Sequence, residues 1–120
     1  MKLAVCGSRE ITIEFHELDK LIDALRLHAV EIVSGGANGI DAVAEEFAYQ
    51  FEIKYTEFPA DWESHGKAAG PIRNRQIAQY ADQLLVIRYP DSKGSISVAS
   101  EFRKLGKPVT EIILTRNDEV

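Results

Sequence analysis

Three short segments rich in glycine and serine carry the residue types that bind phosphate groups. They are GSR at residues 7–9, SGGANGID at residues 34–41 and DSKGS at residues 91–95. Glycine lets backbone N–H groups approach an anion closely, and a helix that starts at such a turn adds about half a positive charge. One turn of this kind is common in α/β proteins. Two of them at neighbouring strand ends would form a phosphate cradle.

Positively charged side chains fall in or beside these segments: Arg9, Lys67, Arg73, Arg75 and Lys93. Arg73 and Arg75 are two positions apart on an expected helix and therefore point to different sides. We expect one of them to reach the cradle and the other to be solvated. The chain has a net charge of −5, with its acids concentrated on the expected helices and the tail. A local site can still be positive in such a protein.

Two further side chains have more than one interpretation. Asp41 lies in the first turn of an expected helix, where it could contact a ribose or be occupied by the backbone donors that begin the helix. Trp62 could stack on a base, but a tryptophan that covers the core is the favoured interpretation.

The remaining candidates point away from metal and redox chemistry. Cys6 is expected to pack at a buried strand end, and one cysteine cannot form an internal disulfide. His16, His28 and His65 are too scattered for a metal site, so we expect neither a metal nor a cofactor. Residues 1–9 lack the apolar stretch of a signal peptide or membrane span. A cytoplasmic protein without membrane contact is therefore expected.

Apolar runs ended by glycine, proline or polar residues predict the strands that position these segments. The expected strands are 3–6, 30–33, 53–58, 84–87 and 109–114. The run at 53–58 alternates apolar and polar residues and ends at Pro59, which favours an edge strand.

Helical spacing of apolar residues predicts four helices between the strands. Thr12 is expected to cap the first, and the second carries its apolar face from Ile40 to Phe51. The third begins near Pro71, and the fourth runs from Ser95 to Leu105 and ends at Gly106. Residues 60–69 show no periodicity that predicts an element, and residues 116–120 form a polar tail.

This alternation predicts an α/β fold, a Rossmann-like three-layer sandwich formed as one domain by residues 1–120. The parallel five-stranded sheet is expected in the order 3-2-1-4-5, and ligands of such sheets bind beyond the carboxyl ends of the strands. The loops after strands 1, 2 and 4 should share one cleft there.

The chain resembles the SLOG superfamily, and within it the small YspA/YpsA-related proteins. The motifs that carry the resemblance span nearly the whole chain: GSR, SGGANGID, FPADW, GKAAGPIRNRQI, KGS and GKPV. SGGANGID and the RN pair are also similar to the Rossmann domain of DNA-processing protein A, a single-strand DNA binder. The last glycine turn resembles that of the LOG phosphoribohydrolases, which release a base from a nucleoside monophosphate.

The resemblance implies a Rossmann-like fold, homo-oligomers, and ligands such as nucleotides or ADP-ribose derivatives. It implies these ligand-binding residues: Gly7, Ser8, Arg9, Ser34, Gly35, Gly36, Gly39, Asp41, Arg73, Asn74, Gly94 and Ser95.

One departure concerns catalysis. The hydrolases place a glutamate three residues beyond the second residue of their Gly-Thr turn, and Val98 stands there in this chain. Glu101 lies one turn further and is expected to be a solvated helix residue. Arg73 and Glu101 would be the catalytic candidates if the protein were an enzyme, but an enzyme is not the favoured interpretation.

The leading hypothesis is therefore a module that senses or sequesters a nucleotide or ADP-ribose-like molecule. A phosphoribohydrolase acting on nucleoside monophosphates is one alternative. Single-stranded DNA binding is the other, and the net charge of −5 counts against it, because nucleic-acid affinity comes from neutralising many phosphates.

Overall fold

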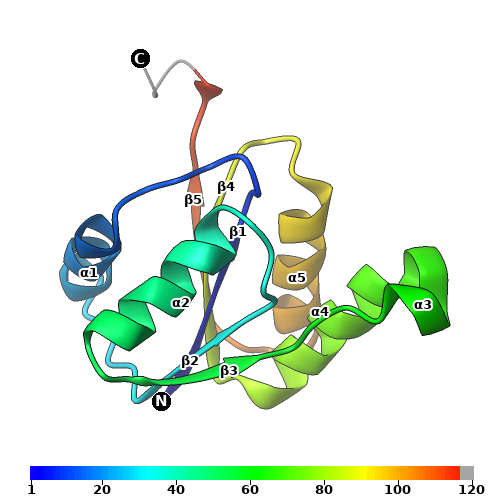
Figure 1. Ribbon diagram of the computed structural model, residues 1–120, viewed down its shortest axis with the longest axis horizontal. Helices are drawn as coiled ribbons and strands as arrows, with labels where there is room; N and C mark the ends of the chain where they lie inside the picture. Colours follow the sequence, from blue (N-terminus) through cyan, green and yellow to red (C-terminus); the bar gives the residue numbers. More distant parts are fainter. Residues whose placement is uncertain (117–120) are drawn as a thin grey trace.

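A parallel sheet of five strands forms the middle layer, in the order β3-β2-β1-β4-β5. The computed structural model describes residues 1–116 of the chain (Figure 1). The strands are β1 Lys2–Gly7, β2 Glu31–Ser34, β3 Lys54–Glu57, β4 Gln83–Arg88 and β5 Val109–Ile113. The predicted Rossmann-like fold and strand order are confirmed, and β3 lies at an edge as its alternating sequence indicates.

Helices cover both faces of this sheet. Their bounds are α1 Phe15–Ala24, α2 Ile40–Gln50, α4 Ala69–Tyr80 and α5 Lys93–Lys104. A short helix, α3 Trp62–His65, and a 3-10 turn, Gly66–Ala68, lie between β3 and α4. This segment projects from the rest of the molecule at the outer end of α4 (Figure 1). No helix within residues 1–116 is long and apolar enough to cross a membrane.

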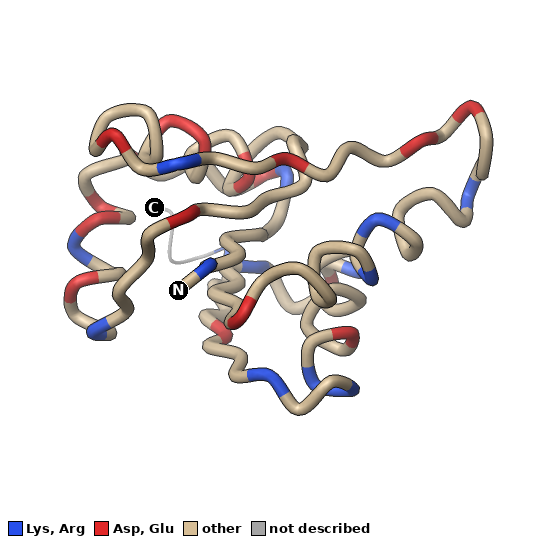
Figure 2. Tube along the Cα trace, turned by 90° about the horizontal axis from the view of Figure 1, so that it is seen from below, with Lys and Arg blue, Asp and Glu red and all other residues tan. Residues whose placement is uncertain are grey.

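Charged residues of both signs are spread along the chain (Figure 2). The positive site that the sequence predicts must therefore come from a few cations at one place.

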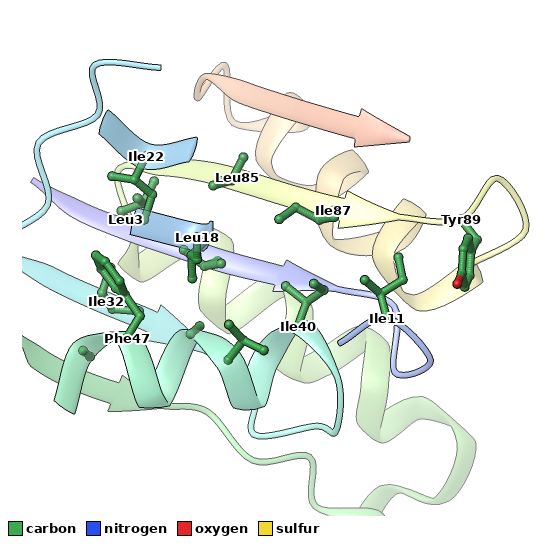
Figure 3. Packing of buried hydrophobic residues seen from close by; sticks show 14 residues of the cluster. Leu3, Ile11, Leu18, Ile22, Ile32, Ile40, Phe47, Leu85, Ile87 and Tyr89 are labelled. Atoms are coloured by element: carbon green, nitrogen blue, oxygen red, sulfur yellow. The ribbon is translucent and has the colours of Figure 1, made fainter. Parts of the chain in front are cut away.

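The two central strands, β1 and β4, are apolar at residues 3–6 and 84–87 because both of their faces are buried there. On β1, Leu3 and Val5 belong to the core beneath α1 and α2, whereas Ala4 and Cys6 belong to the core beneath α4 and α5. Figure 3 shows Ile40 and Phe47 of α2 directed at the sheet on the first of these faces. Packing on both sides fixes the strand ends, and with them the loops that follow.

The strand ends differ from the predicted ones by at most one residue, and the first and last helices begin at other residues than predicted. The first helix is capped at Glu14 and not at Thr12. The backbone N–H of Glu14 donates to Oε1 of Glu17 at 3.1 Å. The side chain of Glu17, in the first turn, therefore accepts a backbone donor that has no partner within the helix. The last helix begins at Lys93, two residues before Ser95. Of the predicted polar tail, residues 117–120 lie outside the described residues.

A polar cluster at the amino ends of the strands fixes the edge of the sheet. Glu31 is buried and accepts hydrogen bonds from the hydroxyls of Tyr80 and Thr56, and Lys54 Nζ lies 3.5 Å from its Oε1. Burial alone would raise the pKa of the Glu31 carboxyl, but these hydrogen bonds and the Lys54 charge hold it below its ordinary value. The ionised carboxylate therefore stabilises the fold.

Glu31→Gln should lower the free energy of unfolding at pH 7 by about 1–2 kcal/mol, because hydrogen bonds to a charged acceptor are replaced by neutral ones. A lowered native pKa gives stability that is present above the unfolded pKa and lost as the pH falls through the native pKa. The difference between wild type and variant should thus be full above about pH 5 and shrink below about pH 4. Urea unfolding from pH 3.5 to 7 measures it. A difference that is constant with pH would show that the ionised carboxylate is not the stabilising form.

Candidate ligand-binding site

A hollow of about 320 Å³ opens beyond the carboxyl ends of β1 and β4. We call it the main hollow. It is lined by Cys6, Gly7, Ser8, Arg9, Glu10, Ala37, Asp41, Arg73, Asn74, Ile77, Tyr89, Asp91, Ser92, Gly94, Ser95, Val98 and Arg116. These residues come from β1 and the loop after it, the loop after β2 and the start of α2, α4, the loop after β4, α5, and the segment after β5. This is the place where open α/β sheets bind ligands.

A second hollow of about 300 Å³, the side hollow, lies beyond the ends of β2 and β3. It is lined by Arg9, Gly35, Gly36, Ala37, Asn38, Glu57, Pro59, Ala60, Trp62 and Arg73. Arg9, Ala37 and Arg73 line both hollows. The loops after strands 1, 2 and 4 therefore meet at one end of the sheet, as predicted.

Arg73 stands at the junction of the two hollows and is held there by the protein. Its Nη1 donates to the carbonyl oxygen of Gly35 at 2.8 Å, and its Nε donates to Oδ1 of Asn74 at 2.9 Å. Within residues 1–116, Nη2 has no protein acceptor. The guanidinium is thus fixed in position with donors left over for a ligand.

Asn74 connects this arginine to the turn that begins α5. It is buried, and its Nδ2 donates to the carbonyl oxygen of Gly94 at 3.3 Å and to Oγ of Ser97 at 3.2 Å. The RN pair of the sequence therefore acts as a unit, in which Asn74 positions both Arg73 and the start of α5.

Asp41 ties the loops after β1 and β2 together. Its two carboxylate oxygens accept backbone N–H groups of Gly7 at 3.2 Å, Gly35 at 3.2 Å and Ala37 at 3.4 Å. Burial raises the pKa of Asp41 above its ordinary value, and the backbone donors and Arg73 oppose that shift. Of the two interpretations of Asp41, contact with a ribose or hydrogen bonding to backbone N–H groups, the structure shows the second.

The glycines of the site serve two different purposes. At Gly39, φ is +73° and an added Cβ would lie 2.4 Å from the carbonyl oxygen of Ser8, so only glycine lets the two loops pack. At Gly94, an added Cβ would meet no heavy atom within 4 Å. Gly94 lines the main hollow, and neither packing nor backbone conformation requires a glycine there.

Two predicted ligand residues lie outside both hollows. Ser34 is fully buried and its hydroxyl donates to the carbonyl oxygen of Val5 at 2.8 Å, so it joins β2 to β1. Gly39 packs against the loop after β1. Ser8 and Ser95 do line the main hollow; Oγ of Ser8 accepts the backbone N–H of Tyr89 at 3.0 Å, and Oγ of Ser95 lies 2.9 Å from that of Ser92.

The expected group of cations is only partly correct. Arg9 and Arg73 line the hollows, but Lys67, Arg75 and Lys93 line neither. Arg116, expected in the polar tail, lines the main hollow. The predicted strand order was enough to place Arg116 near this site, because residues that follow strand 5 must lie at the same end of a parallel sheet as those that follow strand 4.

The positive charge of Arg116 partly offsets the negative charges of the neighbouring Asp91 and Glu10. Its guanidinium lies 4.3 Å from the ring centre of Tyr89, 3.4 Å from Asp91 and 3.3 Å from Glu10. The acids in the lining of the main hollow are therefore each engaged: Asp41 by the backbone, and Asp91 and Glu10 by Arg116.

Two expectations about single side chains were wrong. Glu101 is not a solvated helix residue: it is buried between α4 and α5, with Arg75 Nε at 3.6 Å and Lys104 Nζ at 3.4 Å. It lines neither hollow, whereas Val98 lines the main one. Trp62 does not cover the core: it is 52% exposed and lines the side hollow.

Cys6 packs at the buried end of β1, as expected. Burial, together with the nearby Asp41 carboxylate, raises the pKa of the Cys6 thiol well above its ordinary value. The thiol therefore stays protonated and unreactive at neutral pH. Within residues 1–116, no group of three or more His, Cys, Asp and Glu side chains could hold a metal ion.

Two solved structures resemble this fold. DNA processing protein A from Streptococcus pneumoniae matches with a TM-score of 0.74 and 24% sequence identity, over 92% of this chain and 49% of that one. A structure of DNA processing protein A from Helicobacter pylori, described for its single-stranded DNA binding mode, matches with a TM-score of 0.69 and 24% identity, over 92% of this chain and 64% of that one. This chain thus spans about half the length of the Streptococcus pneumoniae protein and 64% of the Helicobacter pylori protein.

Sequence comparison gives a more specific result. The Gene 61 protein of Mycobacterium phage D29 is 32% identical over 116 residues, which is 90% of this chain and 93% of the phage protein. The model of the YspA, cpYpsA-related SLOG family matches residues 1–65, which include the GSR and SGGANGID segments and Trp62. The chain therefore belongs to the YspA, cpYpsA-related SLOG family.

Proposed function

We propose that this protein binds a small nucleotide-like molecule and holds its phosphate in the main hollow. The observation that carries the proposal is the Arg73 guanidinium, fixed by Gly35 and Asn74, in the same lining as the turn that begins α5. A fixed guanidinium and the first backbone N–H groups of a long helix are both strong partners for a phosphate.

The glycine at residue 94 is a second reason to place the phosphate at the start of α5. Glycine in the first turn of a helix costs about 0.5–1 kcal/mol relative to alanine, and here packing gives no reason for it. A ligand anion that approaches the backbone at Gly94 and Ser95 would supply the reason, because a Cβ at residue 94 would stand in its way.

A small ligand is favoured over a nucleic-acid strand. Affinity for a strand depends on many phosphate contacts, whereas this chain carries a net charge of −5 with charges of both signs spread along it (Figure 2). The two hollows provide room for one nucleotide-sized molecule. The single-stranded DNA binding described for the Helicobacter pylori protein is thus the second candidate, favoured by the shared fold alone.

Calorimetric titration with AMP, ADP-ribose and adenosine tests the proposal. The two phosphate-bearing ligands should bind with dissociation constants below 1 mM, and adenosine should bind at least tenfold more weakly, because it lacks the charge that Arg73 recognises. Equal binding of AMP and adenosine, or no binding of either phosphate-bearing ligand at millimolar concentration, would refute it.

AMP should remain intact in the site. Cleavage of the N-glycosidic bond requires a carboxylate fixed beside the ribose to stabilise the developing positive charge. Val98 occupies the matching place in the main hollow, and Glu101 is paired with Arg75 and Lys104 outside it. Chromatography of an overnight incubation should show no free adenine above a protein-free control. Turnover that disappears in Glu101→Ala and persists in Asp41→Ala would instead identify a hydrolase with a displaced acid.

A further inference from the structure

The side hollow has a different chemical character from the main hollow. Its lining includes a half-exposed indole, Trp62, and a carboxylate, Glu57. We propose that this hollow holds the nucleoside of the ligand, with the base stacked on Trp62 and a ribose hydroxyl donating to Glu57. This inference rests on the proposed function, because the phosphate in the main hollow sets where the nucleoside begins.

Trp62 has the exposure and the support that a stacking platform requires. The indole is 52% exposed. It belongs to a turn that Asp61 caps, with Oδ1 accepting the backbone N–H of Ser64 at 3.1 Å. Its Cη2 lies 3.5 Å from the position of a Cβ at Gly70, so the ring edge rests against the start of α4. A ring held in this way loses little freedom when a base stacks on it, and such stacking is sequence-tolerant.

Glu57 is fixed at the end of β3 by its neighbours. The hydroxyl of Tyr55 donates to its Oε1 at 3.1 Å, and burial together with Glu57 raises the pKa of Tyr55 well above its ordinary value, which keeps that hydroxyl protonated. An added Cβ at Gly36 would lie 2.5 Å from Cδ of Glu57, so the carboxylate lies over the glycine turn. Within residues 1–116, Oε2 accepts no hydrogen bond.

The carboxylate decides which part of a nucleotide the side hollow can take. A carboxylate only accepts hydrogen bonds and repels phosphate, whereas ribose hydroxyls are donors that suit it. Carboxylates in α/β nucleotide sites bind ribose in this way. The three carboxylates that line the main hollow are engaged by backbone donors or by Arg116, whereas within residues 1–116 Oε2 of Glu57 accepts no hydrogen bond. A phosphate therefore fits the main hollow, and a sugar fits beside Glu57.

The two hollows are joined at two arginines. Arg9 and Arg73 line both. A ribonucleotide whose phosphate contacts Arg73 in the main hollow can thus place its sugar and base in the side hollow. The volumes of about 320 and 300 Å³ are each at the small end for ligand pockets, which favours one ligand that spans both.

Trp62 is the only tryptophan of the chain, so its fluorescence reports on this hollow alone. Titration of the wild-type protein with AMP should change the emission saturably. Ribose 5-phosphate, which carries the phosphate and sugar without a base, should bind in the calorimeter and leave the emission nearly unchanged.

Variants separate the base contact from the sugar contact. Trp62→Ala should weaken AMP binding by about tenfold and leave ribose 5-phosphate binding unchanged, and Trp62→Phe should recover part of the loss. Glu57→Gln should weaken AMP binding by about fivefold and leave 2′-deoxy-AMP binding unchanged, because the contact removed is the one to the ribose 2′-hydroxyl.

The outcomes distinguish this inference from the proposed function. If ribose 5-phosphate binds and AMP binds equally well to wild type and Trp62→Ala, the nucleoside lies elsewhere and only the phosphate site stands. If no phosphate-bearing ligand binds, both are overturned. If a single-stranded oligodeoxynucleotide changes the Trp62 emission at lower concentration than AMP does, the hollow contacts DNA and the ribonucleoside assignment is wrong.

Discussion

Gly39→Ala should lower the free energy of unfolding by about 3 kcal/mol or more, even without any ligand. The left-handed backbone at residue 39, with φ +73°, is strained for any residue with a Cβ. The new Cβ would also lie 2.4 Å from the carbonyl oxygen of Ser8 and 2.6 Å from that of Arg9, both in backbone that cannot move independently. Urea unfolding followed by circular dichroism measures the change.

Gly94→Ala is the matched control, since an added Cβ there meets no heavy atom within 4 Å. Its free energy of unfolding should be unchanged or up to about 1 kcal/mol higher, because alanine favours the helix. Its affinity for AMP should nevertheless fall. If Gly39→Ala were as stable as Gly94→Ala, the close packing of the loops after β1 and β2 would be wrong.

Arg73→Ala should weaken AMP binding by about 10- to 150-fold, which corresponds to the roughly 1.5–3 kcal/mol of a charge-assisted hydrogen bond to phosphate. The loss should be smaller for adenosine, which has no phosphate. Calorimetry gives both dissociation constants. Because Arg73 also contacts Gly35 and Asn74, thermal melting must first show that the variant is folded.

Arg75→Ala is the control for charge. It removes the same charge from the same helix, but Arg75 lines neither hollow and contacts Glu101 instead. Its AMP affinity should stay within about twofold of wild type, since distant exposed charges are screened by salt. Equal losses in the two variants would mean that general electrostatic attraction, and not a specific contact of Arg73, governs binding.

The sequence predicts the fold well because the signals for it are local. Apolar runs such as residues 84–87 are buried on both faces, and glycines and prolines end the elements cleanly. The cap at Thr12 was wrong because Glu14 and Glu17 compete for the same role two residues later. Residues 60–69 gave no pattern because α3 has only four residues and buries none of them.

The site is predicted less completely because its contacts join distant segments. Glycine turns mark the loops, yet they do not reveal that Gly39 is required by packing and Gly94 is not. That difference depends on how close the loop after β1 comes. Burial of Glu101 depends likewise on how α4, with Arg75, packs on α5, and Trp62 is exposed because α3 projects from the fold (Figure 1).

The central claim is that a nucleotide phosphate binds where the loops after β1 and β2 and the start of α5 meet. The most direct measurement is a titration of the ¹⁵N-labelled protein with AMP, followed by amide chemical shifts. The account predicts saturable shifts for residues 7–9, 35–37 and 93–95, all with one dissociation constant, and no shifts near Glu31 and Asp82 at the opposite end of the sheet. Shifts confined to other surfaces, or none at millimolar AMP, would contradict it.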